Sequence, residues 1–203
     1  MAVAPRQVTA ASADPVSKST TLARFLTLLC ARPAAEVVDL GPVVGTNITF
    51  LGDRVGCKIH VADLYADLDR HARQDTLDQI AVFLGSRFPQ RDESIDAILC
   101  WDVFDYLDPA AAGVLAGESM RMLRPEGLLL AFFGGGGSSD LRYTRYSIVD
   151  EAHIRHAFYP GACPRRRVLQ NRDIGNLFAG LTVLDSILLK SGVREVLFQK
   201  PAY

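Results

Sequence analysis

Short apolar runs alternate along the chain with segments in which apolar residues recur every three or four positions. The apolar runs predict strands at residues 36–40, 58–64, 95–101 and 128–133. The runs at 58–64 and 95–101 are too apolar for strands with a solvent-exposed face, so we expect parallel strands buried on both sides. Helical spacing and capping residues predict helices at residues 21–31, 46–52, 76–85 and 109–123. This alternation predicts an α/β fold with a doubly wound, mostly parallel sheet.

The C-terminal part of the chain has a different pattern. Extended segments are predicted at residues 142–149 and 153–159, and a short helix at residues 173–178. The last two predicted strands, residues 182–190 and 193–200, are joined only by Ser191 and Gly192. Parallel strands need a crossover of about a dozen residues or more, so this last pair must be antiparallel.

These elements fit one domain. We expect residues 19–203 to form it, and residues 1–18, which are small and polar without a sustained period, to be a flexible tail. A run of four glycines, residues 134–137, opens a segment that we expect to be a lid or insertion, residues 134–170. This segment follows a predicted strand of the sheet, so it should cap the ligand crevice or dock on a second subunit in a homodimer.

Composition excludes several classes of protein. The 22 Lys and Arg residues against 23 Asp and Glu residues give a net charge of −1, which argues against a nucleic-acid partner. No run approaches the roughly 20 apolar residues that cross a bilayer, and the N-terminus lacks the apolar stretch of a secretory signal. We therefore expect a cytoplasmic protein without a membrane partner. The four cysteines are widely separated, so neither a metal site nor a disulfide framework is predicted.

The turn after the first predicted strand of the sheet is the first candidate binding site. It reads Asp39-Leu40-Gly41-Pro42-Val43-Val44-Gly45 and connects a strand to a helix, which is where an α/β sheet binds nucleotide-like ligands. The spacing fits neither a dinucleotide fingerprint nor a phosphate loop, so binding of NAD or ATP has no support here. A tight structural turn without any ligand is the simpler alternative.

The same turn resembles motif I of the class I S-adenosylmethionine-dependent methyltransferases, an acidic residue followed by alternating glycines. Asp39, Gly41 and Gly45 are in register with that motif, whereas Val43 stands where the middle glycine is usual, so the glycine motif is degenerate. The resemblance implies S-adenosylmethionine as a possible cofactor. It implies that Gly41, Pro42 and Gly45 line the methionine end of the cofactor and that Asp39 orients the loop.

Later stretches resemble the same family of small-molecule methyltransferases in the same order. Asp63 follows Gly45 by 18 residues, where an acidic residue of the family binds the ribose. The resemblance also places Trp101 and Asp102, at the end of the next predicted strand, beside the cofactor. The most specific match is Arg121-Met122-Leu123-Arg124-Pro125-Glu126-Gly127, a signature that opens the fifth strand of the family, and a run that starts at Phe88-Pro89 matches the segment before the fourth strand.

One expected element of the family is missing from the sequence. Its third strand normally ends in an acidic residue that reaches the adenine, yet the segment before Phe88 predicts a helix and has no such acid. We therefore expect a fold in which this strand is absent.

The resemblance implies methyl transfer to an unidentified small molecule by direct displacement. Such a reaction needs alignment and at most one base, so no catalytic residue is assigned. The candidates near the expected opening are Asp102, Asp105, Tyr106, Tyr143, Tyr146 and His153. The run Arg165-Arg166-Arg167 is expected to be a solvated loop, with an anion site as the alternative.

Two other functions stay open. Val43 and the missing third-strand acid favour a catalytically silent methyltransferase-like binding or assembly module as the main alternative. A dehydrogenase is a distant third, because the dinucleotide spacing is missing and the last strand pair is antiparallel.

Overall fold

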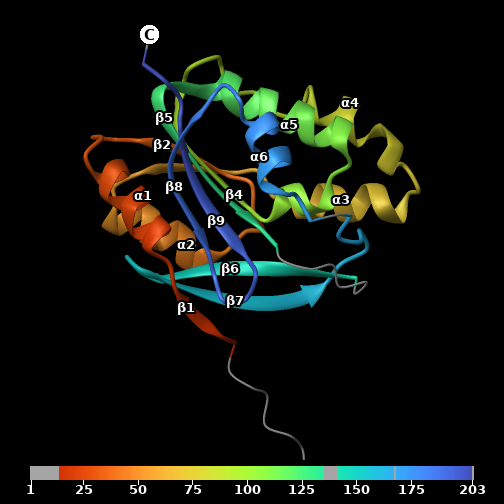
Figure 1. Ribbon diagram of the computed structural model, residues 1–203, viewed down its shortest axis with the longest axis horizontal. Helices are drawn as coiled ribbons and strands as arrows, with labels where there is room; N and C mark the ends of the chain where they lie inside the picture. Colours follow the sequence, from red (N-terminus) through yellow and green to blue (C-terminus); the bar gives the residue numbers. More distant parts are fainter. Residues whose placement is uncertain (1–13, 135–140, 167, 203) are drawn as a thin grey trace, which may run out of the picture.

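The computed structural model describes residues 14–134, 141–166 and 168–202 (Figure 1). Its central sheet consists of β2 (Glu36–Asp39), β3 (Lys58–Val61), β4 (Ile95–Trp101), β5 (Leu123–Phe133), β8 (Thr182–Leu188) and β9 (Arg194–Gln199). The strand order is β3-β2-β4-β5-β9-β8. Strands β3, β2, β4 and β5 are parallel, and β9 is antiparallel to both of its neighbours. The predicted mostly parallel sheet with an antiparallel C-terminal pair is confirmed.

Helices cover both faces of this sheet (Figure 1). One face carries α1 (Thr20–Cys30) and α2 (Gly45–Thr49), which continues into a π-helical turn, Phe50–Arg54. The other carries α3 (Leu64–Arg73), α4 (Ile80–Leu84), α5 (Pro109–Met122) and α6 (Asn171–Leu177). Side chains alternate between the two cores: on β4, Ile98 and Cys100 face α5, whereas Leu99 and Trp101 face α1. No described helix is long and apolar enough to cross a membrane.

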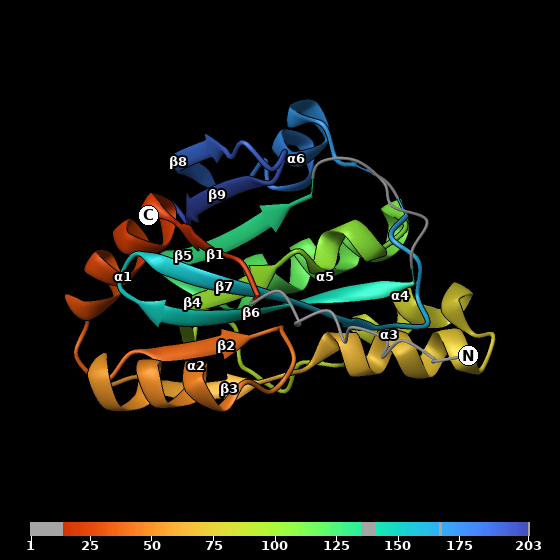
Figure 2. The same ribbon diagram turned by 90° about the horizontal axis from the view of Figure 1, so that it is seen from below.

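A second, smaller sheet lies across the carboxyl ends of the central strands (Figure 2). It has the order β1-β7-β6 and is antiparallel throughout. Its main part is the β6–β7 hairpin, formed by β6 (Arg142–Asp150) and β7 (His153–Pro160). The third strand, β1 (Val16–Lys18), comes from the segment expected to be a tail, so the predicted tail does not extend through Val16–Lys18. Most of the predicted glycine connector, residues 135–137, lies outside the described residues.

Two further elements differ from the sequence prediction. Helix α3 follows β3 directly, where no helix was predicted, and Asp63 caps this helix instead of ending the strand. The helix predicted at 76–85 is split into a 3-10 turn, Leu77–Gln79, and the short α4. Within the described residues no strand pairs with the outer edge of β3, as expected from the missing third strand.

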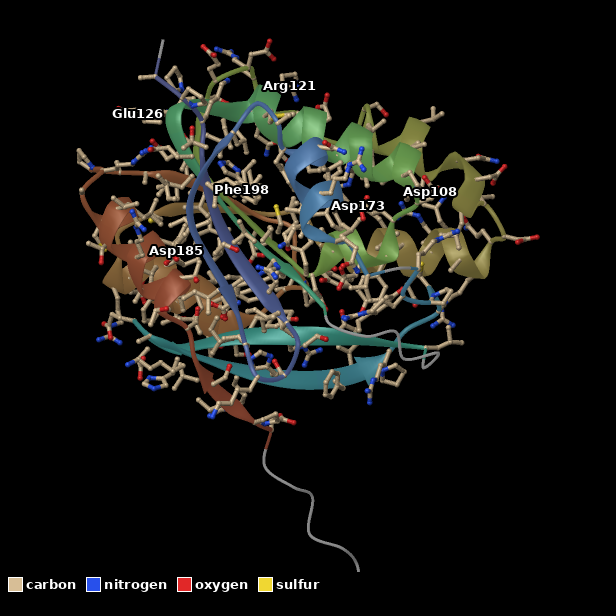
Figure 3. All side chains as sticks on the ribbon, in the orientation of Figure 1. Asp108, Arg121, Glu126, Asp173, Asp185 and Phe198 are labelled. Atoms are coloured by element: carbon tan, nitrogen blue, oxygen red, sulfur yellow. The ribbon has the colours of Figure 1, made fainter. Side chains whose placement is uncertain are left out.

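The family-like signature around Arg121 lies at the amino ends of β4 and β5. Arg121 pairs with Glu118 and Asp92, and it also donates a hydrogen bond to the Gln90 carbonyl. Figure 3 shows Arg121 and Glu126 near one end of α5 and Asp108 at the other. The signature therefore fixes the scaffold at the edge of the sheet opposite to the β6–β7 hairpin.

Candidate functional site

Asp39 joins the glycine loop to the end of β4. Its buried Oδ1 accepts hydrogen bonds from the Gly41 N–H at 2.8 Å and from Trp101 Nε1 at 2.7 Å. Burial raises the pKa of Asp39 to about 6, and the nearby charge of Asp63 acts in the same direction. The structure thus brings together Asp39, Gly41, Asp63 and Trp101, four of the residues predicted for the cofactor site.

Trp101 fills the space beside Gly41. A Cβ atom at position 41 would lie 2.5 Å from Trp101 Cδ1, so only glycine leaves room for the indole. The Trp101 backbone is left-handed, with φ of 49°, a strained conformation for so large a residue. The indole stacks on Tyr146 of β6 with the ring centroids 5.3 Å apart and the planes 6° from parallel. The hairpin therefore contacts the glycine loop through this aromatic pair.

Part of the rest of the loop is open. Val43 is 62% exposed, Pro42 is half-buried, and a Cβ atom at Gly45 would meet nothing within 4 Å, whereas Val44 is buried. The structure therefore leaves space at Val43 and Gly45, next to the side that Trp101 covers.

Asp63 lies two residues beyond the end of β3. Its backbone is left-handed, with φ of 47°, and Oδ1 caps α3 by accepting the Ala66 N–H at 3.1 Å. Strand β3 pairs in parallel with β2, so that Val61 lies opposite Asp39. A half-buried carboxylate therefore stands beside the glycine loop, as the resemblance implies for a ribose-binding residue.

Asp102 connects the core to the segments that cover it. The carboxylate is fully buried and accepts hydrogen bonds from the Tyr65 hydroxyl and from Arg165 Nη2, the latter at 2.5 Å. The side chains of Thr144 and Tyr146 on β6 also lie close to it and help to lower its pKa. Burial raises the pKa of Asp102, and the Arg165 charge and these hydrogen bonds lower it. Its partners come from α3, β6 and the segment after β7, so Asp102 holds the cover in place.

Asp105, in the 3-10 turn Val103–Tyr106, shares Arg165 with Asp102. Its Oδ2 accepts the Gly134 N–H at 2.7 Å and lies 3.2 Å from Arg165 Nη1. Its Oδ1 is buried and has no hydrogen-bond partner among the described residues. Burial, together with the charge of Asp102, raises the pKa of Asp105 to about 8. A single guanidinium thus faces two buried carboxyl groups.

Asn47 fastens the β6–β7 hairpin to helix α2. Its buried side chain donates to the Tyr146 carbonyl at 2.9 Å and accepts the Ile148 N–H at 2.8 Å. On the other side of the site, the Tyr106 hydroxyl donates to the Arg142 carbonyl at 3.1 Å. The hairpin is therefore held to the central domain at both of these points.

Of the remaining candidates, Tyr143 lies at the site and His153 does not. Tyr143 is buried in the same cluster and accepts the Cys163 N–H at 3.0 Å. His153 lies at the turn of the hairpin, paired at 2.9 Å with Asp150 and exposed to solvent in part, so the structure does not bring it to the site. The described residues contain no group of three or more His, Cys, Asp or Glu that could hold a metal ion.

Three contributing residues were missed by sequence reasoning. Arg165 was expected in a solvated loop, which is wrong, because its side chain is only 18% exposed and pairs with two buried acids. A run of three arginines is typical of a solvated loop, so the sequence held no signal that Arg165 pairs with Asp102 and Asp105. Tyr65 and Asn47 were missed as well, although Asn47 stands within two residues of the glycine motif.

A groove of about 280 Å³ lies between the start of α5 and α6. Its walls are mainly apolar and include Leu107, Pro109, Leu169 and Leu177. None of the residues predicted for the cofactor lines this groove, so it is separate from the glycine loop.

Comparisons with known proteins agree with this geometry. Residues 38–131 match a family model described as a methyltransferase domain. No curated protein sequence matches the chain. A 1,6-didemethyltoxoflavin N1-methyltransferase from Burkholderia thailandensis, solved with 1,6-didemethyltoxoflavin and S-adenosylhomocysteine, is 17% identical, with coverage of 89% of this chain and 76% of that chain and a TM-score of 0.54.

Two further solved structures are similar. An S-adenosylmethionine-dependent methyltransferase from Clostridium acetobutylicum is 12% identical, with coverage of 92% of this chain and 93% of that chain and a TM-score of 0.57. A glycopeptide N-methyltransferase in complex with S-adenosylmethionine is 16% identical, with coverage of 97% and 100% and a TM-score of 0.50. At these identities the likeness shows a common fold.

Proposed function

We propose that the chain is a class I S-adenosylmethionine-dependent methyltransferase that transfers a methyl group to a small molecule, because residues 38–131 match a methyltransferase-domain model and solved methyltransferases share its fold. S-adenosylmethionine is the cofactor of this family. The observation that carries the proposal is the placement of Asp39, Gly41 and Asp63 at the carboxyl ends of β2 and β3, beside the open space at Val43 and Gly45.

The residues around the loop fit this cofactor. The Asp63 carboxylate is half-buried beside the loop and can accept hydrogen bonds from ribose hydroxyls. The free space at Gly45 lets a ligand approach the backbone closely. Asp39 holds the loop in shape through the Gly41 N–H. Trp101 covers the Gly41 side of the loop, so we expect the indole to move or to be repacked when the cofactor binds.

When it is bound, S-adenosylmethionine supplies a methyl group on a positively charged sulfur. A nucleophile attacks the methyl carbon, and the sulfur is the leaving group. The chain contributes binding, alignment and exclusion of water. The β6–β7 hairpin provides the exclusion, because Tyr146 stacks on Trp101 and Asn47 fixes the strand that carries Tyr146.

We infer a small acceptor from the aromatic side chains near Asp102. Tyr65 lies 5.7 Å from Tyr106 and 5.3 Å from Tyr143 between ring centroids, in a buried, closely packed cluster. Aromatic side chains suit planar, apolar ligands. The neighbour solved with bound 1,6-didemethyltoxoflavin acts on a small molecule, which supports the same substrate class here.

Calorimetry with S-adenosylhomocysteine tests the proposal without knowledge of the acceptor. We expect measurable binding, together with a change in the emission of Trp101, which is the only tryptophan of the chain. Because Trp101 lies against Gly41 and Tyr146, its emission reports the state of the cofactor site. An absence of both heat and fluorescence change at millimolar ligand would rule out the enzyme and favour a silent binding module.

A further inference from the structure

Asp102 and Asp105 are buried acids, and among the described residues Asp105 Oδ1 is the one of their carboxyl oxygens without a hydrogen-bond partner. We propose that Asp105 Oδ1 takes the proton of the methyl acceptor, so that the acceptor is a compound with a neutral O–H or N–H group. This inference rests on the proposed methyl transfer.

The hydrogen bonds of the cluster select Asp105 over Asp102. Asp102 accepts from Tyr65 at Oδ1 and from Arg165 at Oδ2, so both of its oxygens have a partner. In Asp105, the Gly134 N–H and Arg165 both bind Oδ2 and thereby fix the orientation of the carboxyl group. The other oxygen, Oδ1, is buried and has no partner in the described part of the chain. Buried polar atoms without partners are rare in folded proteins, and such an atom calls for a specific explanation.

The position of Asp105 places it on the acceptor side of the glycine loop. It lies four residues beyond Trp101, which ends the central strand β4, and it contacts Gly134, the residue that follows β5. Contacts run continuously from the loop to the acid: Asp39 to Trp101, Trp101 to Tyr146, and Tyr146 to Asp102. Arg165 then joins Asp102 to Asp105. Asp105 is therefore connected to the loop through Arg165, Asp102 and the Tyr146–Trp101 pair, at the edge where an α/β sheet binds its ligands.

Glycine at position 134 is required by this arrangement. A Cβ atom there would lie 2.6 Å from Asp105 Oδ2 and would also meet the Arg165 guanidinium. Gly134, which follows β5, thus leaves room for the Asp105 carboxyl group and the Arg165 guanidinium.

The charges that face Asp105 suit a proton acceptor. Asp102 at the end of β4 and burial disfavour the charged form of Asp105, whereas Arg165 and the Gly134 N–H favour it. Tyr106 on the same turn and Tyr146 on β6 are neutral, because burial raises the pKa of both hydroxyls. Asp105 is therefore protonated at neutral pH when the site is empty. A second positive charge, that of a bound sulfonium, lowers the pKa of Asp105 and leaves a carboxylate ready to accept a proton.

The step balances without a further reactant. The lone pair of the acceptor oxygen or nitrogen forms the bond to the methyl carbon, the carbon–sulfur bond breaks, and its electron pair stays on sulfur. The acceptor proton passes to Asp105 Oδ1. The carboxyl group returns the proton to water when the product leaves.

Carbon NMR of protein labelled only at aspartate carboxyl carbons tests the inference without an acceptor. We expect one signal that titrates near pH 8 and that is missing from Asp105→Asn and from Asp105→Glu, since neither variant has a labelled carboxyl at this position. The pair of variants keeps the assignment possible if one of them fails to fold. Asp39→Asn, which removes a carboxyl whose pKa is raised to about 6, should leave this signal unchanged.

The decisive comparison is between S-adenosylmethionine, which carries the positive sulfur, and S-adenosylhomocysteine, which is neutral there. We expect the Asp105 midpoint to be lower by about 1–3 pH units with S-adenosylmethionine, as for a carboxyl near an added positive charge. If both ligands bind and the midpoint is the same with each, Asp105 does not face the reacting sulfur and the inference is wrong. If neither ligand binds, the proposed function itself fails.

Discussion

Gly41 and Gly45 belong to one loop but meet different surroundings. Gly41 is buried against the Trp101 indole and the Asp39 carboxylate, whereas Gly45 opens α2 toward free space. The first glycine therefore serves the packing of the chain itself, and the second leaves room for a ligand. Motif I, which looks uniform in the sequence, thus has two separate physical roles here.

The two glycines predict opposite outcomes for the same substitution. Gly41→Ala should lower the free energy of unfolding by about 1–3 kcal/mol, because its Cβ would overlap the indole and force Trp101 from its stack. Gly45→Ala is the matched control and should be neutral or slightly stabilising, since alanine is the better helix former. Urea unfolding of both variants measures this difference, and equal stabilities would show that the indole does not depend on Gly41.

Asp63 has two expected roles, binding of the cofactor and capping of α3, and different substitutions separate them. Asp63→Ala should weaken S-adenosylhomocysteine binding by about 1–3 kcal/mol through loss of a charged acceptor, and it should also destabilise α3 by about 1 kcal/mol through loss of its cap. Asp63→Asn keeps the capping oxygen and should weaken binding alone. Asp108→Asn is the control, because Asp108 caps α5 in the same way through the Ala111 N–H. Calorimetry that finds equal affinities for the Asp63 and Asp108 variants would remove Asp63 from the cofactor site.

Among the secondary-structure elements, the β6–β7 hairpin closes the site, and Asn47 determines how firmly it does so. Its side chain bonds to strand β6 much as a neighbouring strand would, through one donor and one acceptor. This attachment joins the cover to α2, the helix that starts at the glycine loop.

Asn47→Ala should loosen the hairpin without unfolding the central sheet. Loss of two hydrogen bonds at about 1 kcal/mol each leaves the Ile148 N–H without a partner. We expect amide hydrogen exchange at Ile148 to rise by roughly tenfold or more, with little change at Leu129 in β5. Thr46→Ala, an exposed neighbour, is the control. Unchanged exchange at Ile148 would mean that other contacts hold the hairpin.

The sequence was informative wherever burial imposed a simple pattern. The strand at 95–101 is buried along its whole length and reads as an unbroken apolar run. Helix α3 was not predicted, because its sequence is largely polar and its cap, Asp63, had been assigned to the preceding strand. Strand β1 could not be foreseen, because only its pairing with β7, more than a hundred residues later, makes it a strand.

The residues of the candidate site also fall into two groups, those that a local pattern predicts and those that it does not. Asp39, Gly41 and Asp63 follow from one local motif and its spacing, and the structure places them together. The Arg165 bridge to Asp102 and Asp105 depends on how a distant segment folds back over β4, and local pattern contains no trace of that.

For the whole molecule, the buried acids make stability depend on pH. Asp105 in the folded protein has a pKa of about 8, against 3.8 for an unperturbed Asp. Between these values the folded protein holds a proton that the unfolded chain has lost, so the stability contributed by this group falls as pH rises and is gone above about pH 8. The pKa of Asp39 is raised to about 6, so the stability contributed by Asp39 also falls as pH rises toward 6.

We expect the free energy of unfolding to decrease from pH 6 to pH 8 with a slope of at most about 1.4 kcal/mol per pH unit from Asp105. Asp105→Asn removes this titration, so the difference in stability between the variant and the wild type should move in favour of the variant as pH rises. Chemical denaturation at pH 6, 7, 8 and 9 measures it. A difference that stays constant over that range would show that Asp105 is not protonated in the folded protein.

Strand β9 lies between β5 and β8, and this position has a consequence for synthesis on the ribosome. Every hydrogen bond from β5 to that side waits for residues 194–199, which emerge after all other strands have been made. Until then the nascent chain exposes an apolar edge, Leu128 to Phe133, that can pair with another chain. If translation stalls shortly before residue 194, the incomplete chains should therefore aggregate. Chaperones that shield strand edges would prevent this aggregation.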